Sequence, residues 1–157
     1  MLADQHSFIT LVADDSENDL QIILAALKVY PEFRVVHQVH DGAAAIDYLK
    51  GEPPFDDRQR FPFPHLLICD LKMPITDGFQ MLEWIRTQTL PPFVIIVLTG
   101  SGDPADAARA EALGADQVCI KPVRLDYLRE AAGRLKLFME TLPKGIHRET
   151  QSKPATK

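Results

Sequence analysis

Polar residues that could do phosphoryl chemistry stand at the ends of four apolar runs in this chain. They are Asp14, Asp15, Asp70, Thr99 and Lys121. If the apolar runs are parallel strands, their carboxyl ends meet at one edge of a sheet, and these five side chains gather there. Three carboxylates, a hydroxyl and an ammonium at one edge predict a site for Mg²⁺ and a phosphoryl group, because Mg²⁺ prefers hard oxygen ligands.

Each of these residues can take a distinct part in phosphoryl transfer. Asp70 is placed where a carboxylate can attack phosphorus and form an acyl phosphate. Asp14 and Asp15, together with Asp70, can supply oxygens to Mg²⁺, and Thr99 can hydrogen-bond a phosphoryl oxygen. Crowded carboxylates raise one another's pKa, so a divalent ion and the Lys121 ammonium are expected to offset their charge.

The bulk composition is that of one ordinary globular domain. The chain has 157 residues, 46% of them apolar and 25% charged, and a formal charge of −5 that disfavours nucleic acid as a partner. No run approaches the roughly 18 apolar residues that span a membrane, and the first seven residues do not resemble a signal peptide. We therefore expect a cytoplasmic protein without a membrane segment. Its two cysteines lie inside apolar runs, which disfavours a disulfide.

Strand-like and helix-like segments alternate along the chain. The expected strands are 8–13, 34–39, 66–69, 93–98 and 118–120, and the expected helices are 16–30, 43–50, 79–89, 103–114 and 125–142. Such alternation predicts an α/β fold with a doubly wound, five-stranded parallel sheet and helices on both faces. Ser16 is an expected helix N-cap, with Asp19 at capping-box spacing.

Three further segments complete the expected organisation. Residues 1–7 are an N-terminal extension to a domain at 8–142, and the basic segment 143–157 is expected to be disordered. The segment 51–64 is a long loop with four prolines and three phenylalanines. These phenylalanines (Phe55, Phe61 and Phe63) are expected to pack on the domain rather than project freely.

Five short motifs, in order, resemble the receiver domain of bacterial two-component response regulators. They are Leu11-Val12-Ala13-Asp14-Asp15-Ser16, Leu67 to Pro74, Asp77-Gly78, Val97-Leu98-Thr99-Gly100 and Ile120-Lys121-Pro122. The match runs from about Phe8 to Leu142. A register that pairs Ala13 with the first acid of the motif is rejected, because counting back from Asp19-Leu20 puts the acidic pair at Asp14-Asp15.

The resemblance implies a fold, a reaction and a set of site residues. The implied fold is flavodoxin-like, with strand order 2-1-3-4-5. In that family the residue matching Asp70 accepts a phosphoryl group from a sensor histidine kinase, and those matching Asp14 and Asp15 bind Mg²⁺ with a backbone carbonyl at Lys72. Those matching Thr99 and Lys121 read the phosphoryl group. The usual dimer surface, helix 4–strand 5–helix 5, corresponds to residues around 105–113 and 125–138.

A narrower resemblance is to stand-alone regulators that partner bacterial phytochromes. It rests on the long loop at 51–64, the pattern Asp41 to Ile46 and the lack of an output domain. One departure is Val118, where many receivers carry an aromatic residue that couples phosphorylation to conformational change. Lys72 and Ser101 occupy positions that tune the lifetime of the acyl phosphate in the family.

Two other functions remain as alternatives to a phospho-accepting switch. A degenerate receiver would act only as a binding module, although the complete set of acids, Thr99 and Lys121 argues against it. An aspartyl-phosphate hydrolase of the haloacid dehalogenase type would need a second aspartate two residues after the nucleophile, where this chain has Lys72. We therefore expect a protein that catalyses its own phosphorylation and dephosphorylation and is not a turnover enzyme.

Overall fold

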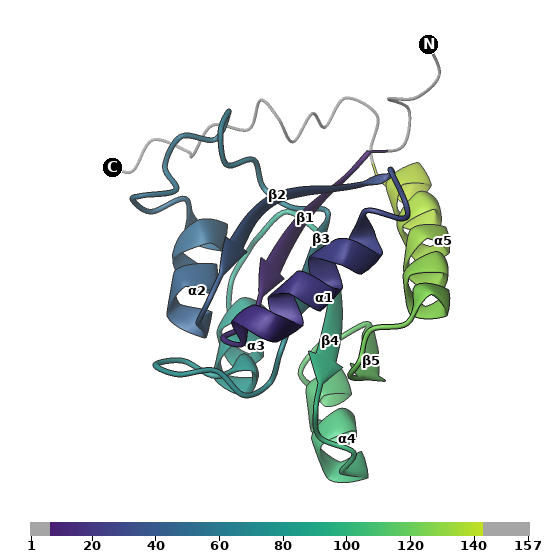
Figure 1. Ribbon diagram of the computed structural model, residues 1–157. Coiled ribbons are helices and arrows are strands. Elements are labelled where there is room, and N and C mark those ends of the chain that lie inside the picture. The colour runs from purple at the N-terminus through teal and green to yellow at the C-terminus, as the bar shows by residue number, and fades with distance from the viewer. Residues whose placement is uncertain (1–6, 143–157) are drawn as a thin grey trace.

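The computed structural model describes residues 7–142, which form a five-stranded parallel sheet with five helices (Figure 1). The elements are β1 (Phe8–Ala13), α1 (Glu17–Leu27), β2 (Phe33–Val39), α2 (Gly42–Lys50), β3 (Leu66–Cys69), α3 (Gly78–Arg86), β4 (Val94–Thr99), α4 (Pro104–Ala112), β5 (Gln117–Ile120) and α5 (Leu125–Thr141). The strand order is β2-β1-β3-β4-β5 and every pairing is parallel. The predicted fold class and strand order are confirmed.

Helices cover both faces of the sheet, as Figure 1 shows. The apolar stripes of α1 and α5 pack with Phe8, Val12 and Ile68 in one cluster of buried side chains. The opposite face packs Leu11 and Leu67 against α2, α3 and the single buried residue of α4. Because both faces are covered, β1, β3 and β4 are buried along their whole length, which explains why their sequences are apolar except for Thr10 and Thr99.

Two helices end three residues before the position that the sequence predicts. The first ends at Leu27 instead of near Tyr30, and the chain continues in tight turns to Phe33. The third ends at Arg86 instead of Thr89, and the Thr87 hydroxyl donates to the Trp84 carbonyl at 2.7 Å. The apolar stripes end at Leu27 and Ile85, inside the observed helices, so the residues expected beyond them lack the periodicity that supports a helix.

The expected capping box at the start of α1 is only half present. Ser16 caps the helix by accepting a hydrogen bond from the Asp19 amide at 3.2 Å. The reciprocal bond is absent among the described residues, because the Ser16 amide donates instead to Asp14 Oδ1 at 2.9 Å. The Asp19 carboxylate is therefore left for another partner. A complete capping box occurs instead at α3, between Asp77 and Gln80.

The long loop between α2 and β3 is fixed to the domain by one guanidinium. Arg58 donates to the carbonyl oxygens of Tyr48 at 2.8 Å, Leu49 at 2.9 Å and Phe61 at 3.1 Å. The Tyr48 hydroxyl donates to the Pro62 carbonyl at 2.9 Å. Phe55 and Phe63, from the loop, are buried, and Phe61 is half-buried. The expectation that these three rings pack on the domain is confirmed.

Other expectations concern the cysteines and the chain ends. Cys69 and Cys119 are both free and buried, with β4 between their strands, as predicted. The basic segment 143–157 and residues 1–6 of the expected extension lie outside the described residues. Within residues 7–142, none of the helices combines the length and the apolar character needed to cross a membrane.

Candidate functional site

The five predicted site residues lie together at the carboxyl edge of the sheet. Backbone hydrogen bonds between neighbouring strands fix their positions: the Asp70 amide donates to the Ala13 carbonyl at 3.0 Å, and the Lys121 amide donates to the Thr99 carbonyl at 2.7 Å. Asp14 and Asp70 thus follow adjacent strands, and so do Thr99 and Lys121. The parallel register therefore brings together residues that are more than a hundred positions apart in the sequence.

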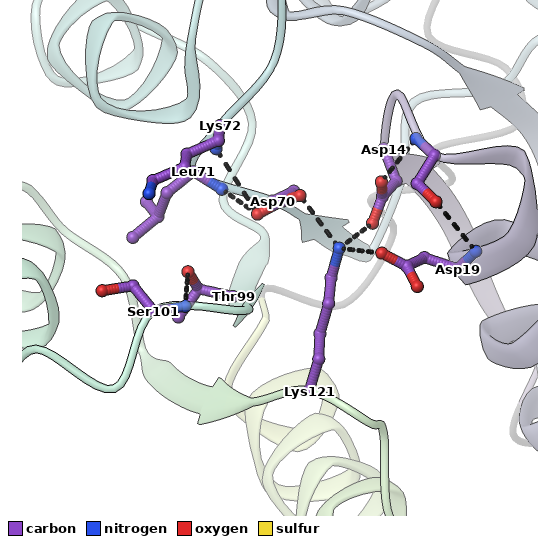
Figure 2. Close-up of polar contacts among 9 residues, drawn as sticks. Asp14, Asp19, Asp70, Leu71, Lys72, Thr99, Ser101 and Lys121 are labelled. Atoms are coloured by element: carbon purple, nitrogen blue, oxygen red, sulfur yellow. Dashed lines mark hydrogen bonds and ion pairs between the residues drawn. The ribbon is translucent and has the colours of Figure 1, made fainter.

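The Lys121 ammonium is the centre of the site (Figure 2). Its Nζ lies 2.7 Å from Asp14 Oδ2, 2.7 Å from Asp19 Oδ2 and 2.9 Å from Asp70 Oδ2. Burial by itself lowers the pKa of Lys121, but the attraction of these three carboxylates outweighs burial and raises the pKa above its ordinary value. Lys121 is therefore a fixed positive charge at neutral pH.

The sequence analysis missed one member of this cluster, Asp19. It lies in the first turn of α1, and its carboxylate points toward Lys121 rather than back to the helix cap (Figure 2). The signal was present, because a helix that starts at the carboxyl edge of β1 directs its first turn toward the site. The capping-box spacing gave the Asp19 carboxylate an equally good local partner, the backbone amide of Ser16. Only the tertiary structure decides between this amide and Lys121.

Asp14 is the most deeply buried acid of the site. Its side chain is 1% exposed, and Oδ1 accepts the Ser16 amide. Its buried Oδ2 pairs with the Lys121 ammonium at 2.7 Å. Burial raises the pKa of Asp14, and the nearby Asp70 charge adds to the rise, whereas Lys121 and the Ser16 amide oppose it.

The carboxylates of Asp14, Asp15 and Asp70 fit a divalent cation. Each offers one oxygen, and these oxygens lie within 4.8 Å of one another. The buried Oδ2 of Asp14 already lies against one cation, the Lys121 ammonium, and all-oxygen donor sets suit Mg²⁺. The part of the Lys72 backbone carbonyl in metal binding stays a prediction.

The backbone around Asp70 is tightly packed. Asp70 Oδ1 accepts the Leu71 amide at 2.7 Å and the Lys72 amide more distantly at 3.4 Å. A Cβ atom at Gly78 would lie 2.3 Å from the Asp70 carbonyl oxygen, so only glycine fits at the start of α3. The Asp-Gly pair in the sequence thus combines a helix cap with the close approach that positions Asp70.

Thr99 is buried at the end of β4, and its hydroxyl oxygen accepts the Ser101 amide at 3.1 Å. The Ser101 hydroxyl donates to Asp106 in the first turn of α4 at 2.7 Å. These two bonds link the site to α4. Val118, the departure noted above, is half-buried in β5 and packs on the side of the sheet that α4 covers.

The comparisons with known proteins decide the family. The family model described as the response regulator receiver domain matches residues 10–133. The chain belongs to the response regulator receiver domain family. A curated relative of this receiver domain is the probable methanogenesis regulatory protein FilR2 of Methanothrix harundinacea, which is 26% identical over 88% of this chain and 87% of its own length.

Phytochrome-associated regulators are among the solved structures that resemble this receiver domain. The bacteriophytochrome response regulator RtBRR is 28% identical, with a TM-score of 0.72 over 93% of this chain and 86% of its own. RPA3017, a response regulator in red light signalling of R. palustris, is 27% identical, with a TM-score of 0.69 over 86% of this chain and 96% of its own. The predicted family, including its likeness to phytochrome-associated receivers, is confirmed.

Proposed function

We propose that this receiver domain, taken as residues 8–142, acts in the cytoplasm as a response regulator that accepts a phosphoryl group on Asp70. The observation that carries the proposal is the convergence of Asp14, Asp70 and Lys121 at one edge of the sheet, within a few ångströms. The chemistry is a transfer: the N–P bond of a kinase phosphohistidine breaks, and a bond forms between phosphorus and an Asp70 carboxylate oxygen. The histidine keeps the electron pair of the broken bond.

The surrounding residues supply the charge and orientation that this transfer needs. The Lys121 ammonium offsets negative charge on the phosphoryl oxygens. The Thr99 hydroxyl accepts a hydrogen bond from the Ser101 amide, and it can keep this bond while its own hydrogen is donated to a phosphoryl oxygen. The Leu71 and Lys72 amides orient the Asp70 carboxylate. Bound to Asp14, Asp15, Asp70 and the Lys72 carbonyl, Mg²⁺ would supply further positive charge for the transferring group.

The decisive experiment is intact-protein mass spectrometry after incubation with acetyl phosphate, with and without Mg²⁺. We expect the wild-type protein to gain one phosphoryl group only with Mg²⁺, and Asp70→Asn to gain none. Asp126→Asn is the matched control, because Asp126 is an exposed carboxylate paired with Arg124 away from the site. Phosphorylation of Asp70→Asn would contradict the assignment of the acceptor, and an unmodified wild-type protein would favour a receiver that acts only as a binding module.

We propose a sensor histidine kinase of the bacterial phytochrome type as the partner. Support comes from the likeness to RtBRR, a bacteriophytochrome response regulator, and to RPA3017, a regulator in red light signalling. Further support is a groove beside the site, between α1 and the segment after β5. Ile22, Pro122 and Val123 line this groove next to Lys121, so an apolar helical surface could dock while its phosphohistidine faces Asp70. Phosphotransfer from a phytochrome kinase should be faster than from an unrelated histidine kinase, and equal rates would contradict this assignment.

We also propose that the phosphorylated protein self-associates through α4, β5 and α5. Exposed apolar side chains on β5 and α5 support this surface, with Ile120 at 53% and Leu137 at 66% exposure. Light scattering after size-exclusion chromatography should show a larger mass with phosphorylation. Leu137→Asp should remain monomeric, and a phosphorylated dimer of Leu137→Asp would exclude this surface.

A further inference from the structure

Three carboxylates surround one ammonium, and one of them lies outside the set that fits the metal. Asp14 and Asp70 belong to both sets, because they contact Lys121 and also share the candidate metal position with Asp15. Asp19 contacts only Lys121, at 2.7 Å. It is also the most exposed of the three carboxylates, at 33%, against 1% for Asp14 and 9% for Asp70.

The shared oxygens create a competition between two cations. Lys121 Nζ lies against Oδ2 of Asp14 and Oδ2 of Asp70, and a divalent ion among the same carboxylates would repel the ammonium. The Lys121 side chain is only 15% exposed, so losing all of its carboxylate partners would leave a poorly hydrated charge, which is unfavourable. Asp19 offers an oxygen that the metal does not need.

We propose that Asp19 is a positioning residue that retains the Lys121 ammonium when a divalent cation binds Asp14 and Asp70. The retained bond lowers the free energy of displacing Lys121 and so strengthens Mg²⁺ binding. It also keeps the ammonium near Asp70, where a phosphoryl group would be formed. This inference rests on the proposed function, because it assigns Asp19 a part in the same site.

The side chain of Asp19 has no other bond in the described structure that would explain its place. Its amide, not its carboxylate, caps α1 through Ser16, so Asp19→Asn leaves that cap intact. Glu17 is a matched control in the same first turn, where its exposed carboxylate accepts only from Gln21. Glu17→Gln removes the same charge and the same interaction with the helix dipole, without contacting Lys121.

The test measures Mg²⁺ affinity by titration calorimetry without a phosphodonor. We expect Asp19→Asn to weaken Mg²⁺ binding about fivefold to tenfold, the scale of one charge-assisted hydrogen bond at a partly exposed site. Glu17→Gln should change it by less than about twofold, as a distant exposed charge does. Equal weakening in the two variants would overturn the proposal, because Asp19 would then act only as one more negative charge.

A double-mutant cycle separates the role of Asp19 from that of general charge. In a Lys121→Met background, adding Asp19→Asn should weaken Mg²⁺ binding no more than adding Glu17→Gln does. The same fivefold to tenfold loss in this background would show that Asp19 does not act through Lys121, and the proposal would be wrong.

Nuclear magnetic resonance of the lysine ammonium gives a second measurement that does not need the Lys121→Met protein to fold. With Mg²⁺ bound, the wild-type Lys121 ammonium should stay protected from solvent exchange, and in Asp19→Asn this protection should be lost. Protection that survives in Asp19→Asn would overturn the proposal.

Failure of this inference is distinguishable from failure of the proposed function. A wild-type protein that binds no Mg²⁺ and gains no phosphoryl group overturns both. A wild-type protein that binds Mg²⁺ and is phosphorylated, while Asp19→Asn behaves like Glu17→Gln, overturns only the role of Asp19.

Discussion

Two cations, each held by three oxygens, stand in different regions of this receiver domain. Lys121, at the carboxyl edge of the sheet, is held by the carboxylates of Asp14, Asp19 and Asp70. Arg58, in the loop before β3, is held by three backbone carbonyls at the end of α2 and in its own loop. Each cation contacts three oxygens, but those around Lys121 carry negative charge and those around Arg58 are neutral.

The difference in ligands explains why one cluster suits chemistry and the other suits structure. Carbonyl oxygens are neutral parts of the backbone, so the bonds from Arg58 hold the loop against α2. Another cation could not replace Arg58 there without unfolding of the loop. Burial lowers the pKa of Arg58, whereas the carboxylates raise the pKa of Lys121. Carboxylates can pair with either an ammonium or a divalent ion, so we expect the cluster around Lys121 to accept a divalent cation without unfolding of the protein.

The largest expected effect is at Lys121 in the absence of Mg²⁺. Lys121→Met leaves the buried charges of Asp14 and Asp70 without their cation, and removing one partner of such a cluster costs about 3 kcal/mol of unfolding free energy. Millimolar Mg²⁺ should recover most of this loss, because the ion replaces the missing charge. Denaturant unfolding with and without Mg²⁺ measures both numbers, and a loss that Mg²⁺ cannot reverse would contradict an exchangeable cluster.

Replacing Arg58 should also lower the stability of the protein, but Mg²⁺ should not restore it. Arg58→Met leaves the carbonyls of Tyr48, Leu49 and Phe61 without their donor, and we expect a loss of about 2 kcal/mol that Mg²⁺ does not reverse. Phosphorylation of Asp70 should persist in the folded variant. Arg60→Met is the control, because Arg60 is exposed and lies over the Phe61 ring, 5.1 Å from its centroid. An equal loss of stability in Arg60→Met would contradict the assignment of the loss to the three carbonyl bonds of Arg58.

A third prediction compares the backbone in the two regions. Gly51, at the end of α2, has φ of 70°, and Ile75, in the loop after Asp70, has nearly the same φ of 68°. Glycine adopts this left-handed conformation freely, but a β-branched residue does so only with strain, here in a tight turn where the Thr76 amide donates to the Pro74 carbonyl.

Replacing each residue tests whether the strain lies only in the loop beside the site. Ile75→Gly should stabilise the protein by about 1 kcal/mol, because Ile75 is 81% exposed and loses little packing. Gly51→Ala should destabilise it, because the added Cβ would also lie 2.9 Å from the Arg58 guanidinium. Thermal unfolding of both variants measures these shifts, and a destabilised Ile75→Gly would show that the turn is not strained.

The smallest expected effect is a pH dependence that belongs to the loop region. His37 packs beside the Tyr48 and Phe55 rings, and its pKa is lowered by burial first and then by the charges of Arg60 and His40. Because the unfolded chain takes up this proton more readily than the folded protein, stability should fall as the pH drops through the ordinary value of 6.5.

His37→Gln should reduce the slope of stability against pH between about pH 7.5 and pH 5. Unfolding midpoints across this range, in the presence and absence of Mg²⁺, make the measurement. An unchanged slope would assign the pH dependence to other groups.

The sequence determined the fold class, the strand order through its family resemblance, and five of the residues at the site. Largely apolar runs in β1, β3 and β4 require cover on both faces, and parallel strands require polar residues at their carboxyl ends to share one edge. The three loop phenylalanines were also placed correctly, because burying a large aromatic ring against the domain is more favourable than leaving it in water.

Only the tertiary structure decided which partner each flexible charged side chain takes. Asp19 satisfies a capping-box spacing in the sequence, yet it bonds Lys121, which lies 102 positions away. Arg58 has no sequence signal, and its three carbonyls become acceptors only after the loop returns to the end of α2. Local periodicity specifies which face of an element is buried, but a long charged side chain selects among oxygens that are brought near it only by the packing of distant elements.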